Sequence, residues 1–201
     1  MTTEADKTQK HQERMQRIKE KVDARVNSAQ EERGLLIVIT GNGKGKSTSG
    51  FGTLTRAVGH GYTAAALQFI KGDWECGERN LLEKHGVEFH VMATGFTWDT
   101  QDKSKDIAAA TKVWAEAKRL LKDETIDVVL LDELTYMLSY KYLDLDEVIE
   151  AIVNRPAMQH VIITGRACHR SIIELADTVS EVQPTKHAFD NGIKAQKGID
   201  W

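Results

Sequence analysis

The 201-residue chain has little cysteine, no excess of basic charge and no long apolar run, and each absence excludes a class of protein. Its two cysteines, Cys76 and Cys168, match no metal-binding or redox spacing, so we expect reduced thiols in a cytoplasmic protein. A net charge of −3 gives no support for nucleic-acid binding as the main activity. Residues 1–30 lack the apolar stretch of a signal peptide, and no apolar run reaches membrane-spanning length, so no membrane partner is expected.

The composition, 41% apolar and 28% charged, is instead that of a soluble globular protein with a substantial core. Residues 1–33 form a charged N-terminal segment, and residues 34–201 form the main domain. The segment carries one narrow apolar stripe at helical spacing: Met15, Ile18, Val22, Val26 and Ala29. One interpretation is a partly ordered, solvated helix. The other is a helix that docks on a partner surface or closes over a site as a lid.

Strands and helices alternate through the main domain. The predicted strands are 35–40, 63–70, 87–93, 126–131, 160–164 and 178–182. The predicted helices follow the glycine-rich segment to about residue 59 and cover 78–85, 104–123, 133–140, 145–154 and 170–176. This alternation predicts an α/β fold, a P-loop NTPase-like parallel sheet of about six strands with helices on both faces. Ligands of such sheets bind at the carboxyl ends of the strands.

The most informative segment follows the first predicted strand and reads Gly41-Asn42-Gly43-Lys44-Gly45-Lys46-Ser47-Thr48. A strand that opens into glycines, followed by Lys-Ser and a helix, is the setting of a phosphate-binding P-loop. Lys46 would reach the outer phosphates, and the Ser47 hydroxyl would ligate Mg²⁺. A glycine-rich turn without function is the alternative, but such a turn has no need for the lysine. We therefore predict that the segment binds a nucleoside triphosphate.

The loop departs from the usual G-x-x-x-x-G-K-[ST] pattern. Only three residues separate Gly41 from Gly45, unless Thr40 is counted as the first position. A tighter loop cannot wrap a triphosphate in the usual way, so ordinary phosphoryl transfer should not be assumed.

Two carboxylates, Asp132 and Glu133, follow the apolar strand at 128–131. In P-loop proteins such a strand lies beside the P-loop strand, and its acid holds Mg²⁺ directly or through water. The alternative for Asp132 is a helix cap. Either Glu133 is the direct metal ligand with Asp132 behind it, or the reverse.

Further candidates follow other predicted strands. Phe96 and Trp98 lie in a glycine-containing loop and either fold that loop onto the core or cover a large flat ligand. Arg166 either belongs to the charged surface or binds a phosphate or carboxylate. His187 in the C-terminal tail either lies on a solvated face or binds an anionic or amide-bearing ligand. The Cys168-His169 pair is a poor nucleophile and base, because adjacent side chains point apart.

Several motifs occur together and in a characteristic order. They are the loop at 41–47, Val58-Gly59-His60-Gly61, Gln68-Phe69-Ile70-Lys71-Gly72, Gly77-Glu78-Arg79-Asn80, Met92 to Trp98, Leu131-Asp132-Glu133-Leu134-Thr135-Tyr136, Ile163-Thr164-Gly165-Arg166 and Lys186-His187-Ala188-Phe189. Together they resemble the ATP:corrinoid adenosyltransferases of bacterial cobalamin synthesis and salvage, over about residues 14–201.

The resemblance implies an enzyme that transfers the 5′-deoxyadenosyl group of ATP to the Co(I) of a reduced corrinoid and releases triphosphate. It implies Mg²⁺, or Mn²⁺ in its place, held by Ser47 and Glu133, with Lys46 and the loop contacting the phosphates. Phe96 and Trp98 would cover the corrin, and Arg166 and His187 are weaker candidates for the same ligand.

The resemblance also implies a homodimer, an N-terminal helix that closes over the corrinoid, and a flavodoxin-like electron donor. Two other functions share the P-loop and the acids. A small-molecule kinase or NTPase would release ADP, and a non-catalytic switch that binds nucleotide and corrinoid would show no turnover.

Overall fold

The computed structural model describes residues 4–70, 75–92 and 103–200, which form six strands in one sheet. The strands are β1 (Leu36–Thr40), β2 (Ala64–Gln68), β3 (Glu88–Val91), β4 (Val128–Asp132), β5 (His160–Thr164) and β6 (Thr178–Glu181). Their order in the sheet is β3-β2-β4-β5-β1-β6, and every neighbouring pair is parallel. The predicted six-stranded parallel sheet is therefore confirmed, with strand limits that differ by up to two residues.

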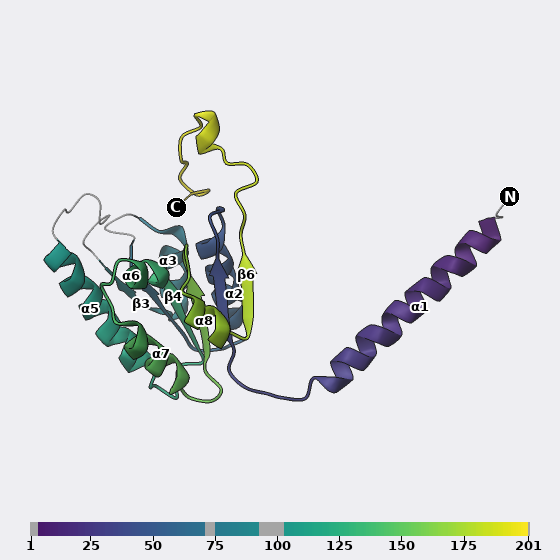
Figure 1. Ribbon diagram of the computed structural model, residues 1–201, viewed down its shortest axis with the longest axis horizontal. Coiled ribbons are helices and arrows are strands. Elements are labelled where there is room, and N and C mark those ends of the chain that lie inside the picture. Colours follow the sequence, from purple (N-terminus) through teal and green to yellow (C-terminus); the bar gives the residue numbers. More distant parts are fainter. Residues whose placement is uncertain (1–3, 71–74, 93–102, 201) are drawn as a thin grey trace. The chain divides into compact units, whose positions relative to one another are not determined.

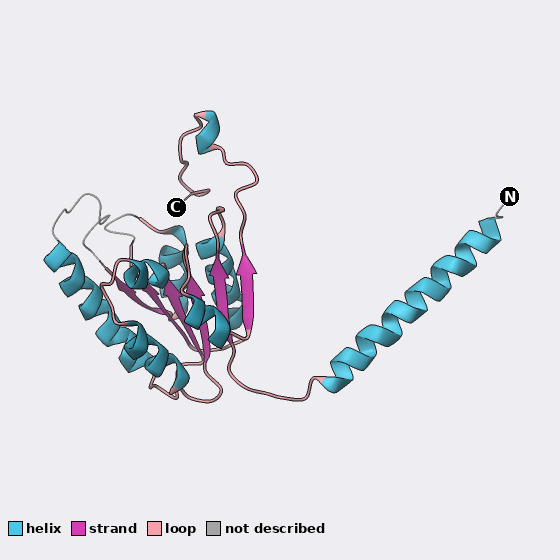
Figure 2. Ribbon diagram, in the orientation of Figure 1, coloured by secondary structure: helices cyan, strands magenta, loops and turns pink. Residues whose placement is uncertain are grey.

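Helices connect the strands and cover both faces of the sheet (Figures 1 and 2). In the main unit they are α2 (Lys46–Gly59), α3 (Gly77–Leu82), α5 (Lys103–Leu120), α6 (Leu134–Ser139), α7 (Leu145–Val153) and α8 (Arg170–Leu175), with short 3₁₀ helices η1 (Glu83–His85) and η2 (Phe189–Asn191). A separate N-terminal unit contains α1 (Glu4–Ser28). Among the described residues, no helix combines the length and the apolar character that crossing a membrane requires.

The alternation of side chains along each central strand explains why both faces are covered. In β4, Val129 and Leu131 belong to one apolar cluster, and Val128 and Leu130 belong to a second. Successive side chains of a strand point to opposite faces, so a continuously apolar strand must be buried on both. Helices α5, α6, α7 and α8 contribute to the first cluster, and α2 and α3 to the second.

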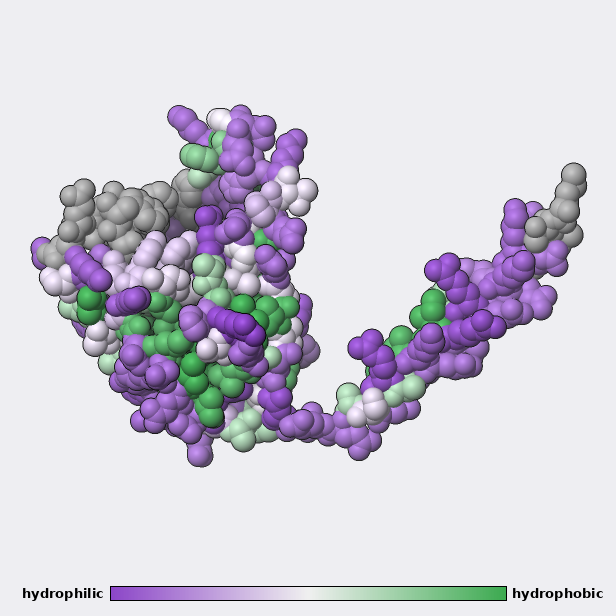
Figure 3. Space-filling view, in the orientation of Figure 1, coloured by the Kyte–Doolittle hydropathy of each residue, from purple (hydrophilic) through white to green (hydrophobic). Residues whose placement is uncertain are grey.

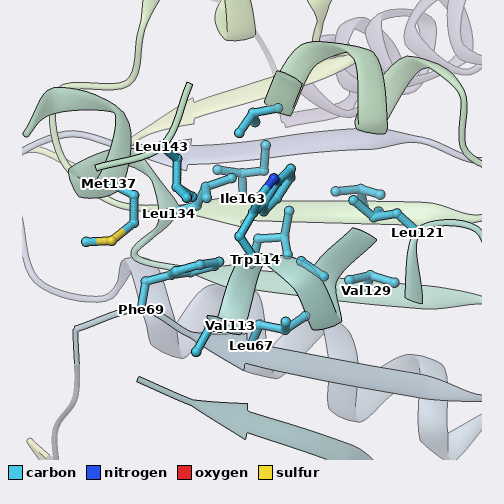
Figure 4. Close-up of a cluster of buried hydrophobic side chains, with 14 of the residues drawn as sticks. Leu67, Phe69, Val113, Trp114, Leu121, Val129, Leu134, Met137, Leu143 and Ile163 are labelled. Atoms are coloured by element: carbon cyan, nitrogen blue, oxygen red, sulfur yellow. The ribbon is translucent and has the colours of Figure 1, made fainter. Parts of the chain in front are cut away.

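The larger cluster is centred on Trp114 of α5, which is 1% exposed. Figure 4 shows its indole between side chains from the sheet, such as Val129 and Ile163, and from the α6 region, such as Leu134. The cluster attaches α5 and α6 to the same face and thereby holds the end of β4 and the start of α6 in place. Burial of a side chain of this size stabilises the fold by about 3 kcal/mol.

One prediction about strand order is wrong. The strand that ends in Asp132 was expected beside the P-loop strand, but β5 lies between β4 and β1. Strands β4 and β1 are both continuously apolar, and their local sequences do not determine which strand each one pairs with. The error matters because the end of β5 then lies between the loop and the acids.

The chain forms two compact units, Met1–Glu32 and Arg33–Trp201. The first contains α1, and its predicted helical character is confirmed. Gln9 and Gln16 each donate a hydrogen bond to a glutamate one turn later, at 3.2 and 3.0 Å. Figure 3 shows apolar residues on one side of this otherwise hydrophilic helix. Met15, Ile18, Val22 and Val26 are all more than 40% exposed.

The glycines of α2 provide a matched test of how closely this helix packs. A Cβ on Gly50 would lie 2.9 Å from Thr164 Cγ2 and 3.0 Å from Leu130 Cδ1, whereas no described atom lies within 4 Å of the same position on Gly52. We expect Gly50→Ala to lower the free energy of unfolding by about 1–3 kcal/mol through overpacking. Gly52→Ala should raise it by about 0.5–1 kcal/mol, because alanine loses less backbone entropy. Urea unfolding measures both changes, and equal effects would contradict the close packing.

Candidate functional site

The predicted phosphate loop connects β1 to α2 and turns on two glycines. Gly41 has a φ of 100° and Gly45 a φ of 116°, values that side-chain-bearing residues rarely adopt. Gly45 occupies the N-cap position of the 14-residue α2. No described atom lies within 4 Å of the position that its Cβ would take. The start of α2 therefore combines an open approach with the positive end of a helix dipole, which favours an anion.

Gly41 and Gly43 pack against the segment that follows β6. The Gly43 N–H donates to the Val182 carbonyl at 2.7 Å, and the Val182 N–H donates to the Thr40 carbonyl at 2.8 Å. A Cβ on Gly41 would lie 2.5 Å from the Val182 oxygen, and one on Gly43 would lie 2.6 Å from the Gln183 oxygen. The segment that follows β6 therefore braces the loop from one side, and only glycine fits against it.

Lys46, the first residue of α2, is 6% exposed and folds back into the loop. Its Nζ donates to the Gly43 carbonyl at 2.7 Å. Burial lowers the pKa of the ammonium, the Glu133 charge opposes that shift, Arg166 adds to it, and Asp132 opposes it. The four charged groups thus act on one another at the carboxyl edge of the sheet, where ligands of such sheets bind.

Asp132 ends β4 and is fully buried. Its carboxylate accepts a hydrogen bond of 2.6 Å from Thr164 Oγ1 and one of 3.3 Å from Gln68 Nε2, so β5 and β2 both hold it. The interpretation of Asp132 as a helix cap is wrong, because Glu133 occupies the N-cap position of α6. Asp132 is a buried acid whose partners come from the two neighbouring strands.

Glu133 has a left-handed backbone conformation, with φ 61° and ψ 22°. Its N–H donates to Thr164 Oγ1 at 3.0 Å. A Cβ on Gly165 would lie 3.2 Å from Glu133 Oε2 and 2.0 Å from Thr135 Oγ1, and Gly165 itself has a φ of 137°. Gly165 therefore lets the Glu133 carboxylate approach the end of β5.

Sequence reasoning missed several residues that shape this edge. Thr164 was quoted only as part of a motif, and Gln68 likewise. Tyr136 of α6 lies close enough to Glu133 that burial first, and then the Glu133 charge, raises the pKa of its phenol. A threonine or glutamine at the end of an apolar strand is an ordinary residue, and only the strand order reveals what it touches.

The remaining predicted site residues differ in their surroundings. Lys44 is exposed and forms an ion pair with Asp200, so the C-terminal tail returns to the loop. His187 is half-buried, and its Nδ1 accepts a hydrogen bond from the Phe189 N–H at 3.1 Å. The hydrogen bond to Lys44 is the main cause that lowers the Asp200 pKa, to which the His187 charge contributes. Phe96 and Trp98 lie outside the described residues, as does the segment 71–74.

Other potential metal ligands lie away from this edge. Within the described ranges, the ligand atoms of Glu88, His90 and Glu116 lie within 4.8 Å of one another. The Arg119 guanidinium already pairs with both glutamates. Glu88 is the first residue of β3, the edge strand on the side of the sheet away from β1. This group is therefore an ion-pair network. The candidate oxygen ligands for a metal at the loop are Ser47, Asp132 and Glu133.

The Cys168-His169 pair follows Arg166, and the prediction that it is no nucleophile–base pair is confirmed. His169 caps α8, because its Nδ1 accepts a hydrogen bond from the Ser171 N–H at 3.3 Å. Burial raises the pKa of the Cys168 thiol to about 11. The thiolate is the reactive form, so this cysteine is inert at neutral pH.

We expect native Cys168 to be alkylated slowly by iodoacetamide. With a pKa of about 11, about one thiol in a thousand is ionised at pH 8, against roughly one in four for an unperturbed thiol. The rate should rise about tenfold per pH unit between pH 7 and 10. Mass spectrometry of the modified protein measures it, and urea-unfolded protein is the control. Native and unfolded rates that agree at pH 8 would contradict the raised pKa.

These features define the chain as an α/β protein of the P-loop type, with its candidate site at the carboxyl edge of a parallel sheet. The family model described as "ATP:corrinoid adenosyltransferase BtuR/CobO/CobP" matches residues 32–201. The model described as "Cob(I)alamin adenosyltransferase N terminal" matches residues 1–26. The chain belongs to the ATP:corrinoid adenosyltransferase family, as its motifs had indicated.

Curated relatives cover almost the whole chain. It is 66% identical to the corrinoid adenosyltransferase of Escherichia coli (strain K12). The 193 aligned residues cover 96% of this chain and 98% of the relative. It is 63% identical to the corrinoid adenosyltransferase CobA of Salmonella typhimurium over the same shares of both chains. A corrinoid adenosyltransferase of Pseudomonas aeruginosa is 49% identical over the full length of both proteins.

Proposed function

We propose that this protein transfers the 5′-deoxyadenosyl group of ATP to the Co(I) centre of a reduced corrinoid. The observation that carries the proposal is the full-length similarity, up to 66% identity, to relatives named corrinoid adenosyltransferases. In the reaction Co(I) attacks C5′, the Co–C5′ bond forms, the C5′–O5′ bond breaks, and triphosphate leaves with the electron pair.

The chain's own residues would stabilise the departing triphosphate. We propose that the loop from Gly41 to Thr48 holds it, with the Lys46 ammonium and the first N–H groups of α2 facing the charge that develops. Preorganised donors in a partly buried site act strongly because they need no reorientation during the reaction. The buried position of Lys46 and the open approach beside Gly45 support this role.

The donor set fits Mg²⁺, which prefers oxygen ligands and keeps few protein groups beside phosphate and water. We propose that the Ser47 hydroxyl and the Glu133 carboxylate hold the ion, with Asp132 behind Glu133. The hydrogen bonds of Asp132 to Thr164 and Gln68 support this order, because they already engage its carboxylate. When bound, the ion would neutralise triphosphate charge as a Lewis acid. Mn²⁺ would suit the same oxygen ligands.

We propose that four residues contact the corrinoid. Phe96 and Trp98 would cover the corrin, and Arg166 and His187 would contact its periphery. We further propose a cytoplasmic homodimer that receives electrons from a flavodoxin-like protein. Within the described residues both cysteines are free thiols, which supports a reducing compartment.

The test of the proposed function is anaerobic. Purified protein, Mg-ATP and chemically reduced cob(I)alamin should develop the absorbance spectrum of adenosylcobalamin, with one triphosphate released per product. ADP as the product would indicate a kinase or NTPase, and binding of both ligands without products would indicate a switch.

In the same assay we expect Lys46→Ala to lower kcat/KM by about 10²–10³-fold, the effect of removing one preorganised donor. Corrinoid affinity, measured by the spectral change on binding, should stay within about twofold, since the lysine faces phosphate. Lys84→Ala is the control, because Lys84 is exposed in η1. Equal loss of turnover and corrinoid binding would contradict a phosphate role for Lys46.

We also propose that the apolar stripe of α1 closes over the bound corrinoid. Deletion of residues 1–28 should then weaken corrinoid retention by about a hundredfold or more, because burial of two apolar side chains contributes about 3 kcal/mol or more. Thermal unfolding should show the main unit still folded. Ile18→Gln with Val22→Gln should reproduce the loss, and Lys21→Gln on the same helix should not. Unchanged retention in the deletion would refute the lid.

A further inference from the structure

We propose that Thr164 is a positioning residue that couples the two acids and sets the orientation of Glu133, an inference that rests on the proposed function of Glu133 and Asp132. Thr164 is the last residue of β5, the strand that separates β4 from β1, and it is fully buried. Its side chain contacts three separate parts of the site.

The hydroxyl of Thr164 links the two acids in one direction. It donates its single hydrogen to Asp132 Oδ1 at 2.6 Å, and its oxygen accepts the Glu133 N–H at 3.0 Å. Because a hydroxyl has one donor and two acceptor positions, donation to the carboxylate leaves a lone pair for the amide. Asp132 thus fixes the hydroxyl, and the hydroxyl fixes the Glu133 backbone.

The Glu133 backbone requires such a partner. Its left-handed conformation, with φ 61°, is unfavourable for a residue with a Cβ and persists only where the surroundings enforce it. That conformation turns the chain from β4 into α6 and brings Oε2 toward Gly165. In the observed conformation the Glu133 charge also acts on Lys46. The hydroxyl therefore controls where the candidate ligand points.

The methyl group of Thr164 has a separate contact. Cγ2 lies 2.9 Å from the position that a Cβ on Gly50 would occupy, so it packs against α2. The β-branched side chain has few χ1 rotamers, and the methyl contact and the hydroxyl bonds select the same one. Hydroxyl and methyl are separable by substitution, which makes the proposal testable.

The experiment compares four residues at position 164. Thr164→Val keeps the methyl and removes the hydroxyl, Thr164→Ser does the reverse, and Thr164→Ala removes both. The first readout is hydrogen exchange of the Glu133 amide in protein without ligands, with the Leu130 amide as internal control. The second is ATP affinity by calorimetry with and without Mg²⁺, in the absence of corrinoid. The third is kcat and KM for adenosyl transfer.

We expect valine and alanine to speed exchange of the Glu133 amide at least tenfold and to leave the Leu130 amide unchanged. Both should lower kcat and the Mg²⁺-dependent gain in ATP affinity by about 10–100-fold, as loss of a residue that orients a ligand does. ATP affinity without Mg²⁺ should stay within about twofold. Serine should resemble threonine in all three readouts, with only a lower unfolding temperature.

A serine variant as impaired as the valine variant would overturn the proposal, since the methyl would then be the important group. Valine and alanine variants that match the wild type would overturn it as well. If the valine variant does not fold, the comparison of serine with alanine isolates the hydroxyl. Failure of wild-type adenosyl transfer would refute the proposed function alone, because amide exchange and ATP affinity test Thr164 without the corrinoid.

Discussion

A buried O–H···O hydrogen bond of 2.6 Å joins the last residues of two neighbouring strands, Thr164 of β5 and Asp132 of β4. Parallel pairing of Leu131 with Ile163 brings both residues to the same level of the sheet. Beyond this level, β4 continues into Glu133 and β5 continues into Gly165. The methyl of Thr164 meets α2 at Gly50, so the helix that follows the loop is positioned against the same residue.

The opposite side of the loop is fixed by backbone rather than side chains. Val182 accepts from Gly43 and donates to Thr40, so the end of β6 extends the sheet into the loop. This explains Gly41 and Gly43 without invoking a ligand, and it leaves Gly45 beside the open approach, next to the buried Lys46. Burial lowers the pKa of Lys46 and the Arg166 charge adds to this shift, while the charges of Glu133 and Asp132 oppose it. A bound polyphosphate would bring charge that favours the ammonium form.

The sequence predicted the parts of the fold that depend on local pattern. Continuous apolar strands predicted burial on both faces, and alternation with helices predicted parallel pairing, which together placed the loop, the acids and Arg166 at one edge. The position of β5 could not be predicted, because strand order depends on contacts distant in sequence. The roles of Thr164 and Asp200 were missed for the same reason. A terminal threonine and a tail aspartate acquire meaning only from the segments that they meet.

The two lysines of the loop show what the short spacing between Gly41 and Gly45 does. Lys44 is exposed and pairs with Asp200, and such exposed ion pairs contribute little to stability because water screens them. Lys46, two residues later, is buried and donates to Gly43. The tight loop therefore keeps one lysine inside and leaves the other on a weakly held contact with the tail. One interior cation with a helix N-terminus suits a triphosphate that departs as a unit, because the developing charge lies at one end of it.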